Sequence, residues 1–169
     1  MQDIHIYLRV NDAKAVLVDE FNQPLSSNQI PCLTRGVRCN LVLHLLSSDG
    51  EPIPPAELAQ CVAWDFVLDN DWNTATTPKI RVYEGIKVEN STITVPLGDT
   101  NTTELIAYLT GAEQKSLGAE LAGFDESNVY PNFLIQFDVA VRNRRSDAGT
   151  GKPTQVPDGS YTAAQLQAL

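Results

Sequence analysis

The chain has 169 residues, of which 43% are hydrophobic and 20% are charged, a balance typical of a globular protein and unlike that of disordered or collagen-like chains. Its 12 basic and 21 acidic residues give a net charge of −9 at pH 7, which argues against binding to nucleic acid or to an anionic membrane, since both require a basic surface. The longest apolar runs, 41–46 and 133–141, are far shorter than the roughly 20 residues that cross a bilayer, so no membrane insertion is expected.

Much of the chain alternates between apolar and polar residues, which indicates β-strands because successive side chains of a strand point to opposite faces. The clearest run places Phe133, Ile135 and Phe137 on one face and Gln136 and Asp138 on the other. We expect strands over residues 4–10, 14–18, 38–45, 62–68, 80–82, 86–88, 92–97, 117–124 and 133–142. Strands with one buried and one wetter face are typical of antiparallel sheets.

Two short helical segments are expected between the strands. Residues 56–60, which follow a proline-rich loop that ends at Pro55, are expected to form a single helical turn. A longer helix should start at Asn101, which can cap it with Glu104 three residues later as in a capping box, and should end near Gly111. Together the elements predict an all-β domain over residues 1–145, an antiparallel two-sheet sandwich crossed by one short helix.

The composition changes after Arg145. Residues 146–160 are rich in Gly, Pro, Ser and Thr, which predicts a linker. Residues 161–169 are predicted to begin a C-terminal helix, with Leu166 and Leu169 spaced to lie on one face. A helix shorter than about 12 residues is marginal on its own. These two leucines therefore predict a partner, on this chain or on a second copy, and an oligomerisation stalk.

Residues suited to metal binding are isolated from one another in the sequence. His5 and His44 are the only histidines, and each falls on the polar side of its strand without a nearby His or Cys. A metal site would need further ligands from elsewhere, so we interpret both as solvent-facing side chains. Cys32, Cys39 and Cys61 form an odd set without metal-type spacing, which predicts free thiols.

No motif singles out a catalytic group. Asp65, Asp69 and Asp71 cluster near a predicted strand end, but the glycine and bidentate glutamate of a calcium loop are missing, so we interpret them as an Asx-rich turn that caps its own backbone. No Gly-x-Ser-x-Gly sequence supports a serine nucleophile, and nothing selects a pair of carboxylates for hydrolysis. We therefore predict no catalytic residue, no metal, no cofactor and no enzymatic activity.

Two groups of residues are candidates for partner binding. Arg142, Arg144 and Arg145 form either a charged strand end that discourages edge pairing or a docking patch for an acidic partner. Of the two tryptophans, Trp64 falls in an apolar alternation that predicts core, whereas Trp72 lies beyond the strand and could stack on a sugar ring.

Several short segments resemble, in their order along the chain, the N-terminal domain of upper-baseplate proteins, which are tail proteins of phages and prophages that carry receptor-binding modules. The segments are Leu33-Thr34-Arg35-Gly36, Asp49-Gly50-Glu51-Pro52, Trp64-Asp65-Phe66, Thr102-Thr103-Glu104-Leu105, Glu120-Leu121-Ala122-Gly123, Gln136-Phe137-Asp138-Val139 and Val141-Arg142-Asn143-Arg144. The resemblance implies an immunoglobulin-like, non-enzymatic domain that anchors on the tail, followed by a helix that assembles copies, often as trimers.

Two functions from different classes follow from these observations. The first is a structural attachment domain of a phage or prophage tail protein, in the baseplate or a fibre, with other tail proteins and copies of itself as partners. Its location would be the virion tail after synthesis in the bacterial cytoplasm, because the first residues lack the features of a signal peptide. The alternative is a carbohydrate-binding or adhesion module of a bacterial surface protein, with Trp72 exposed as the stacking platform.

Overall fold

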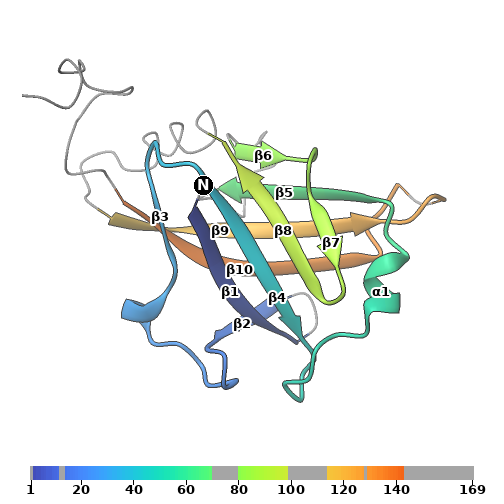
Figure 1. The fold of residues 1–169 in the computed structure, drawn as a ribbon, viewed down its shortest axis with the longest axis horizontal. Coiled ribbons are helices and arrows are strands. Elements are labelled where there is room, and N and C mark those ends of the chain that lie inside the picture. Colours follow the sequence, from blue (N-terminus) through green and yellow to red (C-terminus); the bar gives the residue numbers. More distant parts are fainter. Residues whose placement is uncertain (1, 12–13, 70–79, 99–113, 128, 143–169) are drawn as a thin grey trace, which may run out of the picture.

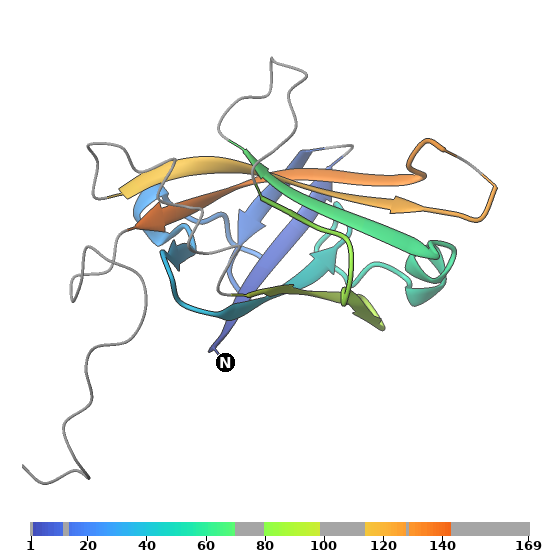
Figure 2. The same cartoon turned by 90° about the horizontal axis from the view of Figure 1, so that it is seen from above.

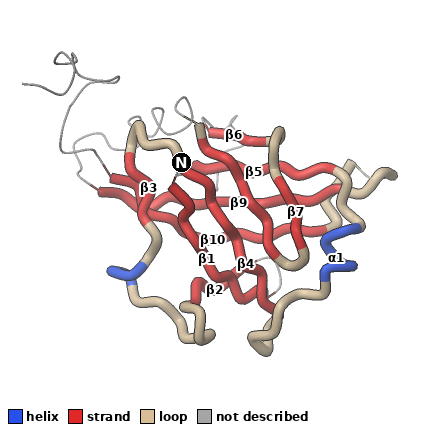
Figure 3. The backbone as a smooth tube through the Cα atoms, viewed as in Figure 1, coloured by secondary structure: helices blue, strands red, loops and turns tan. Residues whose placement is uncertain are grey.

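The computed structural model describes residues 2–11, 14–69, 80–98, 114–127 and 129–142. Its strands are β1 (Gln2–Asn11), β2 (Lys14–Val18), β3 (Cys32–Thr34), β4 (Cys39–Leu46), β5 (Ala63–Asp69), β6 (Ile80–Val82), β7 (Lys87–Glu89), β8 (Thr92–Leu97), β9 (Gln114–Phe124) and β10 (Phe133–Arg142) (Figure 1). Two short helices accompany them, the 3-10 turn η1 (Ser27–Gln29) and α1 (Pro55–Ala59) (Figure 3). The prediction of an all-β domain is confirmed.

All ten strands belong to one mixed sheet. Its order is β6-β5-β9-β10-β2-β1-β4-β8-β7, and β3 pairs with β10 beside this path. β1 runs parallel to β4, and β10 runs parallel to both β2 and β3. The antiparallel two-sheet sandwich predicted from the sequence is therefore corrected to a single sheet with parallel pairs. Alternation reports which face of a strand is buried, but it does not report the direction of the neighbouring strand.

The sheet curls into a half-barrel that encloses the core. Figure 2 shows β5, β9 and β10 in one layer and β4, β7 and β8 in a facing layer, with β1 crossing diagonally between them. The curl thus brings two parts of the same sheet face to face. Each strand can bury one face in this arrangement, as the alternation requires, without a second separate sheet.

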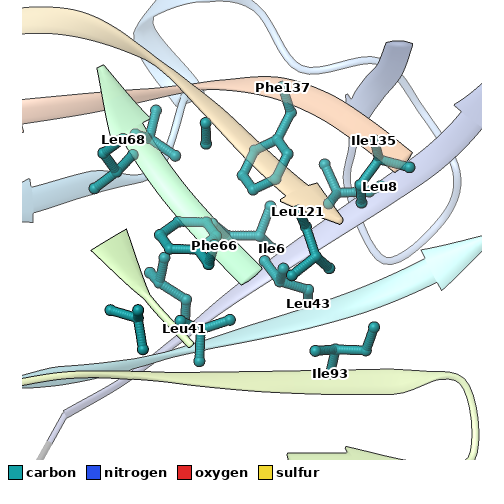
Figure 4. Packing of buried hydrophobic residues seen from close by; sticks show 14 of the residues in the cluster. Ile6, Leu8, Leu41, Leu43, Phe66, Leu68, Ile93, Leu121, Ile135 and Phe137 are labelled. Atoms are coloured by element: carbon teal, nitrogen blue, oxygen red, sulfur yellow. The ribbon is translucent and has the colours of Figure 1, made fainter. Parts of the chain in front are cut away.

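The core consists of the alternating apolar residues of both layers. In β4, for example, Cys39, Leu41, Leu43 and Leu45 are buried, while the residues between them are only partly buried. Figure 4 shows aliphatic side chains of β1, β4 and β8 packed toward the aromatic side chains of β5 and β10. Phe66 and Phe137 meet in this core with ring centroids 6.4 Å apart. Each fully buried side chain of this size contributes about 1.5–3 kcal/mol through removal of apolar surface from water.

Several local predictions can be compared with the structure. Asn11 and Lys14 are the last register partners of the antiparallel β1–β2 pair. The expected helical turn is present as α1, which begins at Pro55, one residue earlier than predicted, and buries Leu58. Gly50 takes a positive φ of 89°, which suits a turn residue without a Cβ. Strand β9 begins at Gln114, three residues before the predicted start at 117.

Other predictions fall on parts of the chain that the structure does not describe. The helix expected to start at Asn101, the linker 146–160 and the C-terminal helix 161–169 all lie outside the described residues. Among the described residues, no helix combines the length and the apolarity needed to span a bilayer.

Candidate functional site

Arg142 is the one member of the predicted arginine patch that the structure describes. It is exposed at the end of β10, opposite Gln114 of β9 on one side and Thr34 of β3 on the other. Its Nε donates a hydrogen bond to Thr34 Oγ1 at 3.1 Å. Because both edges of β10 are paired at this point, the interpretation of Arg142 as a guard against edge pairing is wrong. The docking interpretation stays a prediction.

The remaining partner-binding predictions lie outside the described residues. These are Arg144, Arg145, Leu166 and Leu169, together with Trp72 of the carbohydrate-binding alternative. Trp64, in contrast, is in the core as predicted, with 8% of its surface exposed. It packs edge-to-face on Phe133, with ring centroids 5.7 Å apart.

The three cysteines are free thiols, as predicted. Cys39 and Cys61 are buried, and Cys32 is half-buried beside β10. Burial raises the pKa of Cys39 to about 11 and also raises the pKa values of Cys32 and Cys61. Since the thiolate is the nucleophilic form, these thiols are poorly suited to covalent chemistry near neutral pH.

The Asx-rich turn predicted near the end of β5 lies partly outside the described residues. Asp65 and Asp69 are both strand residues, and Asp71 lies outside the described residues. Asp65 Oδ1 accepts a hydrogen bond from Arg81 Nε of β6 at 2.9 Å, forming an ion pair on the outer face of the sheet. In the described part of the chain, no three His, Cys, Asp or Glu side chains come together as a metal site.

The outer face of β1 and β4 holds an aromatic group that the sequence did not reveal. We call His5, Tyr7 and His44 the histidine cluster. His5 Nδ1 lies 2.9 Å from His44 Nε2, a hydrogen bond between two imidazoles on adjacent strands. Tyr7 stacks on His44, with ring centroids 4.4 Å apart and ring planes 11° apart. The three rings thus lie in contact on the exterior of the half-barrel.

The parallel pairing of β1 and β4 builds this cluster. Tyr7 is the register partner of His44, and His5 is the partner of Val42, so all four side chains share one face. The row continues from His44 to Thr92 of β8 and then to Glu89 of β7. At the start of the same two strands, Asn40 donates a hydrogen bond to Asp3 at 3.0 Å.

Partial burial lowers the pKa of His44, and the neighbouring His5 lowers it further. The neutral form of His44 therefore predominates at pH 7. A hydrogen bond between two imidazole nitrogens also requires a lone pair on one of them, so both rings cannot be protonated while the bond persists. The histidine cluster thus includes at least one neutral imidazole, that of His44, at pH 7.

Sequence reasoning placed both histidines on the outer face but did not bring them together. They are separated by 39 positions, and their contact depends on a parallel pairing that alternation does not predict. The available signal was that both histidines fall on the wetter side of long alternating runs, which places them on the same face of the sheet but does not bring them together without the parallel register.

One charged side chain is buried among the described residues. Arg35, immediately after β3, is only 1% exposed, and its backbone N–H donates to the carbonyl oxygen of Arg142 at 2.9 Å. Arg35 belongs to Leu33-Thr34-Arg35-Gly36, one of the segments that resemble upper-baseplate proteins. Gly36 in this segment has a positive φ of 75°. Its burial gives this segment a structural role in holding the chain against the end of β10.

Exposed apolar side chains gather at the opposite end of β10. Val129 and Tyr130 of the β9–β10 connection are 85% and 79% exposed. Val62, which precedes β5, is 61% exposed and its N–H bonds to the carbonyl oxygen of Phe124 at the end of β9. We call Val62, Val129 and Tyr130 the apolar end of the sheet.

No family model matches the chain, and no curated protein is similar to it.

Proposed function

We propose that this chain is a structural attachment domain of a phage or prophage tail protein, which works by presenting a rigid surface to other tail proteins rather than by catalysis. The proposal rests on the resemblance of its short segments to the N-terminal domain of upper-baseplate proteins. The resemblance also implies an immunoglobulin-like sandwich, but the sheet is single and has parallel pairs, so the proposal concerns the attachment role alone (Figure 2).

The observation that carries the proposal is where those segments lie in the fold. Five of them, which come from separate parts of the chain, lie wholly or partly on the neighbouring strands β5, β9, β10 and β3. Register partners join them directly: Trp64 with Gly123, Glu120 with Gln136, Val141 with Leu33, and Arg142 with Thr34. The segment Asp49-Gly50-Glu51-Pro52 lies apart, beyond the end of β4.

Side-chain contacts within this region support a structural use of these residues. Gln136 Nε2 donates to Glu120 Oε2 at 2.9 Å, and Arg142 donates to Thr34. Gly123 lies against Trp64 and Cys61 so closely that an added Cβ would be 2.6 Å from Cys61 Sγ. The residues of the resemblance therefore hold strands together, which is what an attachment domain without moving parts requires.

Two exposed surfaces can serve such a domain. The apolar end offers Val62, Val129 and Tyr130, and exposed apolar residues of this kind commonly mark protein contacts. Arg142, with Arg144 and Arg145 following it in sequence, offers positive charge to an acidic partner on a chain that is otherwise strongly acidic. Leu166 and Leu169 would then set the number of copies, with a trimer as the expected state.

Co-purification with tail proteins tests the attachment function. The chain is expressed together with each tail protein encoded beside it, and complexes are isolated by affinity purification. We expect one stable partner, whose binding is weakened by Tyr130→Ala or Arg142→Glu. Tyr83→Ala and Lys87→Glu are matched controls, because these residues are also exposed but belong to neither surface. The proposal would be overturned if the gene for this chain has no tail-protein genes beside it, or if the chain binds none of the tail proteins that those genes encode.

Light scattering tests the assembly of copies, and a glycan array tests the alternative. We expect a mass three times 18.5 kDa, reduced to a single chain by Leu166→Asp together with Leu169→Asp. Binding to a defined glycan by a monomeric chain, lost in Trp72→Ala, would instead identify the carbohydrate-binding function.

A further inference from the structure

We propose that the outer face of β1, β4, β8 and β7 pairs with the same face of a second copy of this chain, around a two-fold axis that crosses the strands. We call this surface the β1–β7 face, and Figure 2 shows its layer at the lower side of the molecule. Its side chains form four rows of register partners, and none of them is fully buried. The rows are Asp3, Asn40 and Pro96; then His5, Val42, Thr94 and Lys87; then Tyr7, His44, Thr92 and Glu89; and finally Arg9 and Leu46.

The charges of β1 are placed so that two copies complement each other. Asp3 belongs to the first row and Arg9 to the fourth, so both are equally far from the middle of the face. This middle lies between the rows of His5 and Tyr7. A two-fold axis through it, across the strands, reverses the order of the rows in the second copy. Asp3 of each copy then lies opposite Arg9 of the other, where opposite charges attract.

The same axis also pairs the charges of the edge strand β7. Lys87 belongs to the second row and Glu89 to the third, so they lie on either side of the middle of the face. Reversal of the rows therefore places Lys87 of each copy opposite Glu89 of the other. No further Asp, Glu, Lys or Arg of these four strands lies on this face. A single axis thus satisfies all of its acidic and basic residues.

The middle of the β1–β7 face has the composition of a protein contact. Its two central rows hold the three rings of the histidine cluster together with a valine and two threonines. The centres of protein interfaces are likewise rich in aromatic residues and poor in charge. The hydrogen bond between His5 and His44 and the stacking of Tyr7 on His44 hold these rings in place. Little side-chain freedom is therefore lost when two copies pair.

The other outer face of the half-barrel is unsuited to self-pairing. On the outer side of β6, β5, β9 and β10, the acidic residues Asp65, Asp69, Glu120 and Asp138 outnumber the basic residues Arg81 and Arg142. Two copies that approached through this side would repel each other, as does the net charge of −9 in general. The β1–β7 face carries balanced charge, so it is the side on which copies can approach.

The size of the face makes the contact weak. Four neighbouring strands and four rows span about 15 by 20 Å, so two copies bury on the order of 600–800 Å² in total. Stable complexes bury about 1,200 Å² or more. We therefore expect a single chain in dilute solution and pairing with a Kd on the order of 100 µM. Pairing then becomes significant where copies are concentrated, and it is separate from assembly through the C-terminal segment.

Sedimentation velocity of the full chain, from about 1 µM to about 1 mM, tests for pairing. The chain carries Leu166→Asp and Leu169→Asp, so assembly through the C-terminal segment cannot contribute and the two proposals can fail separately. We expect the mass to rise from 18.5 kDa toward twice that value as the concentration increases. The rise should be smaller at high salt, because salt screens the ion pairs.

Charge reversal identifies the face. Asp3→Arg and Arg9→Glu should each weaken self-association by more than about tenfold, because like charges then meet twice in each dimer. An equimolar mixture of these two variants should regain the affinity of the unreversed chain, since each supplies the charge that complements the other. Mixing would not correct a folding defect. Glu57→Lys and Lys115→Glu are matched controls, because they change the net charge equally at exposed positions away from the face.

Lys87→Glu mixed with Glu89→Lys provides an independent pair, measured on the chain alone. All three residues of β7 are exposed, so these substitutions leave the core untouched. The proposal would be overturned if the mass stays that of a single chain up to about 1 mM. It would also be overturned if the reversed variants associate as strongly as the controls, or if the mixtures associate no better than each variant by itself. Loss of a tail protein from the Asp3→Arg chain on co-purification would show that a different partner covers this face.

Discussion

Gly123 of β9 lies directly under the Trp64 ring of β5, so closely that a Cβ on Gly123 would be 2.8 Å from a ring carbon. The two residues are register partners, and Cys61 closes the same space from the side. The tryptophan can therefore lie flat against the sheet only because its partner has no side chain. This contact fixes one end of the core and links two segments of the proposed attachment region.

Gly123→Ala should destabilise the chain by about 1–3 kcal/mol, since the added methyl group forces the Trp64 ring and Cys61 to shift. Urea unfolding at neutral pH gives the free energy. The cause can be isolated with Trp64→Phe, which removes the ring carbons nearest to Gly123. If the contact is responsible, the double variant loses less stability than the sum of the two single variants. Additive losses would show that the methyl group acts elsewhere.

Because the thiol of Cys39 is buried, we expect the folded chain to lose stability at alkaline pH. Its pKa rises from 9.0 to about 11 on folding, because burial disfavours the thiolate. Between these two values the unfolded chain has lost its thiol proton while the folded chain retains it, so stability falls as pH rises. The effect should reach at most about 2–3 kcal/mol near pH 11.

Comparison with Cys39→Ala isolates this contribution from the ionisation of tyrosines and lysines, which both chains share. The variant should be less stable at pH 7, since it leaves a small cavity, but its stability should decline less between pH 9 and pH 11. Parallel declines in the two chains would contradict the assignment.

Because the pKa of His44 is lowered in the folded chain, we expect a loss of stability below neutral pH. Its pKa in the folded chain lies below 6.5, so the unfolded chain takes up a proton first as pH falls. Stability is therefore complete above pH 6.5 and decreases as pH drops through the folded pKa. The titratable groups on the facing elements are Asp3, His5 and Tyr7 of β1, with Lys87 and Glu89 of β7 at the end of the rows.

Unfolding of the wild type and His44→Gln, measured at pH 7.5 and pH 5.5 with EDTA present, tests this expectation. Glutamine retains a polar side chain but does not titrate, so the variant should lose less stability between the two pH values. An equal or larger loss in the variant would show that other groups are responsible for the acid sensitivity.

The sequence predicted the elements and their buried faces more successfully than it predicted how they are assembled. The alternation from Cys39 to Leu45 correctly placed four side chains in the core, because burial of one face is a local property of the strand. The pairing of β1 with β4 depends instead on contacts between residues 37 positions apart. No pattern within either strand specifies a parallel neighbour, so the antiparallel sandwich was the wrong assembly of largely correct parts.

The candidate site illustrates the same division. His5 and His44 were each placed on the wetter face by their own strands, and both were interpreted as isolated. Their contact follows only from the parallel register that places Tyr7 opposite His44. Asp65 is a second example. Its sequence neighbours Asp69 and Asp71 suggested a turn, but Asp65 lies within β5 and forms an ion pair with Arg81 of the adjacent strand β6.

The parallel register of β1 and β4 can itself be tested by cross-linking. Asp3 and Asn40 are register partners that already share a hydrogen bond of 3.0 Å. Replacing both, as Asp3→Cys with Asn40→Cys, should therefore place two thiols within the Cα separation of about 4.4–6.8 Å that a disulfide requires. Mild oxidation should join them, and mass spectrometry of the digested chain identifies the bond and separates it from any that involves the native cysteines.

The matched control shifts one thiol along the same face of β4. Asp3→Cys with Val42→Cys places the pair two residues out of register, beyond about 7 Å, where a disulfide cannot form without movement of the backbone. If β1 instead ran antiparallel to its neighbour, as the sandwich predicted, Asp3 would have no reason to prefer Asn40. Efficient cross-linking of the first pair alone would thus establish the pairing on which the histidine cluster depends, and equal cross-linking of both pairs would contradict it.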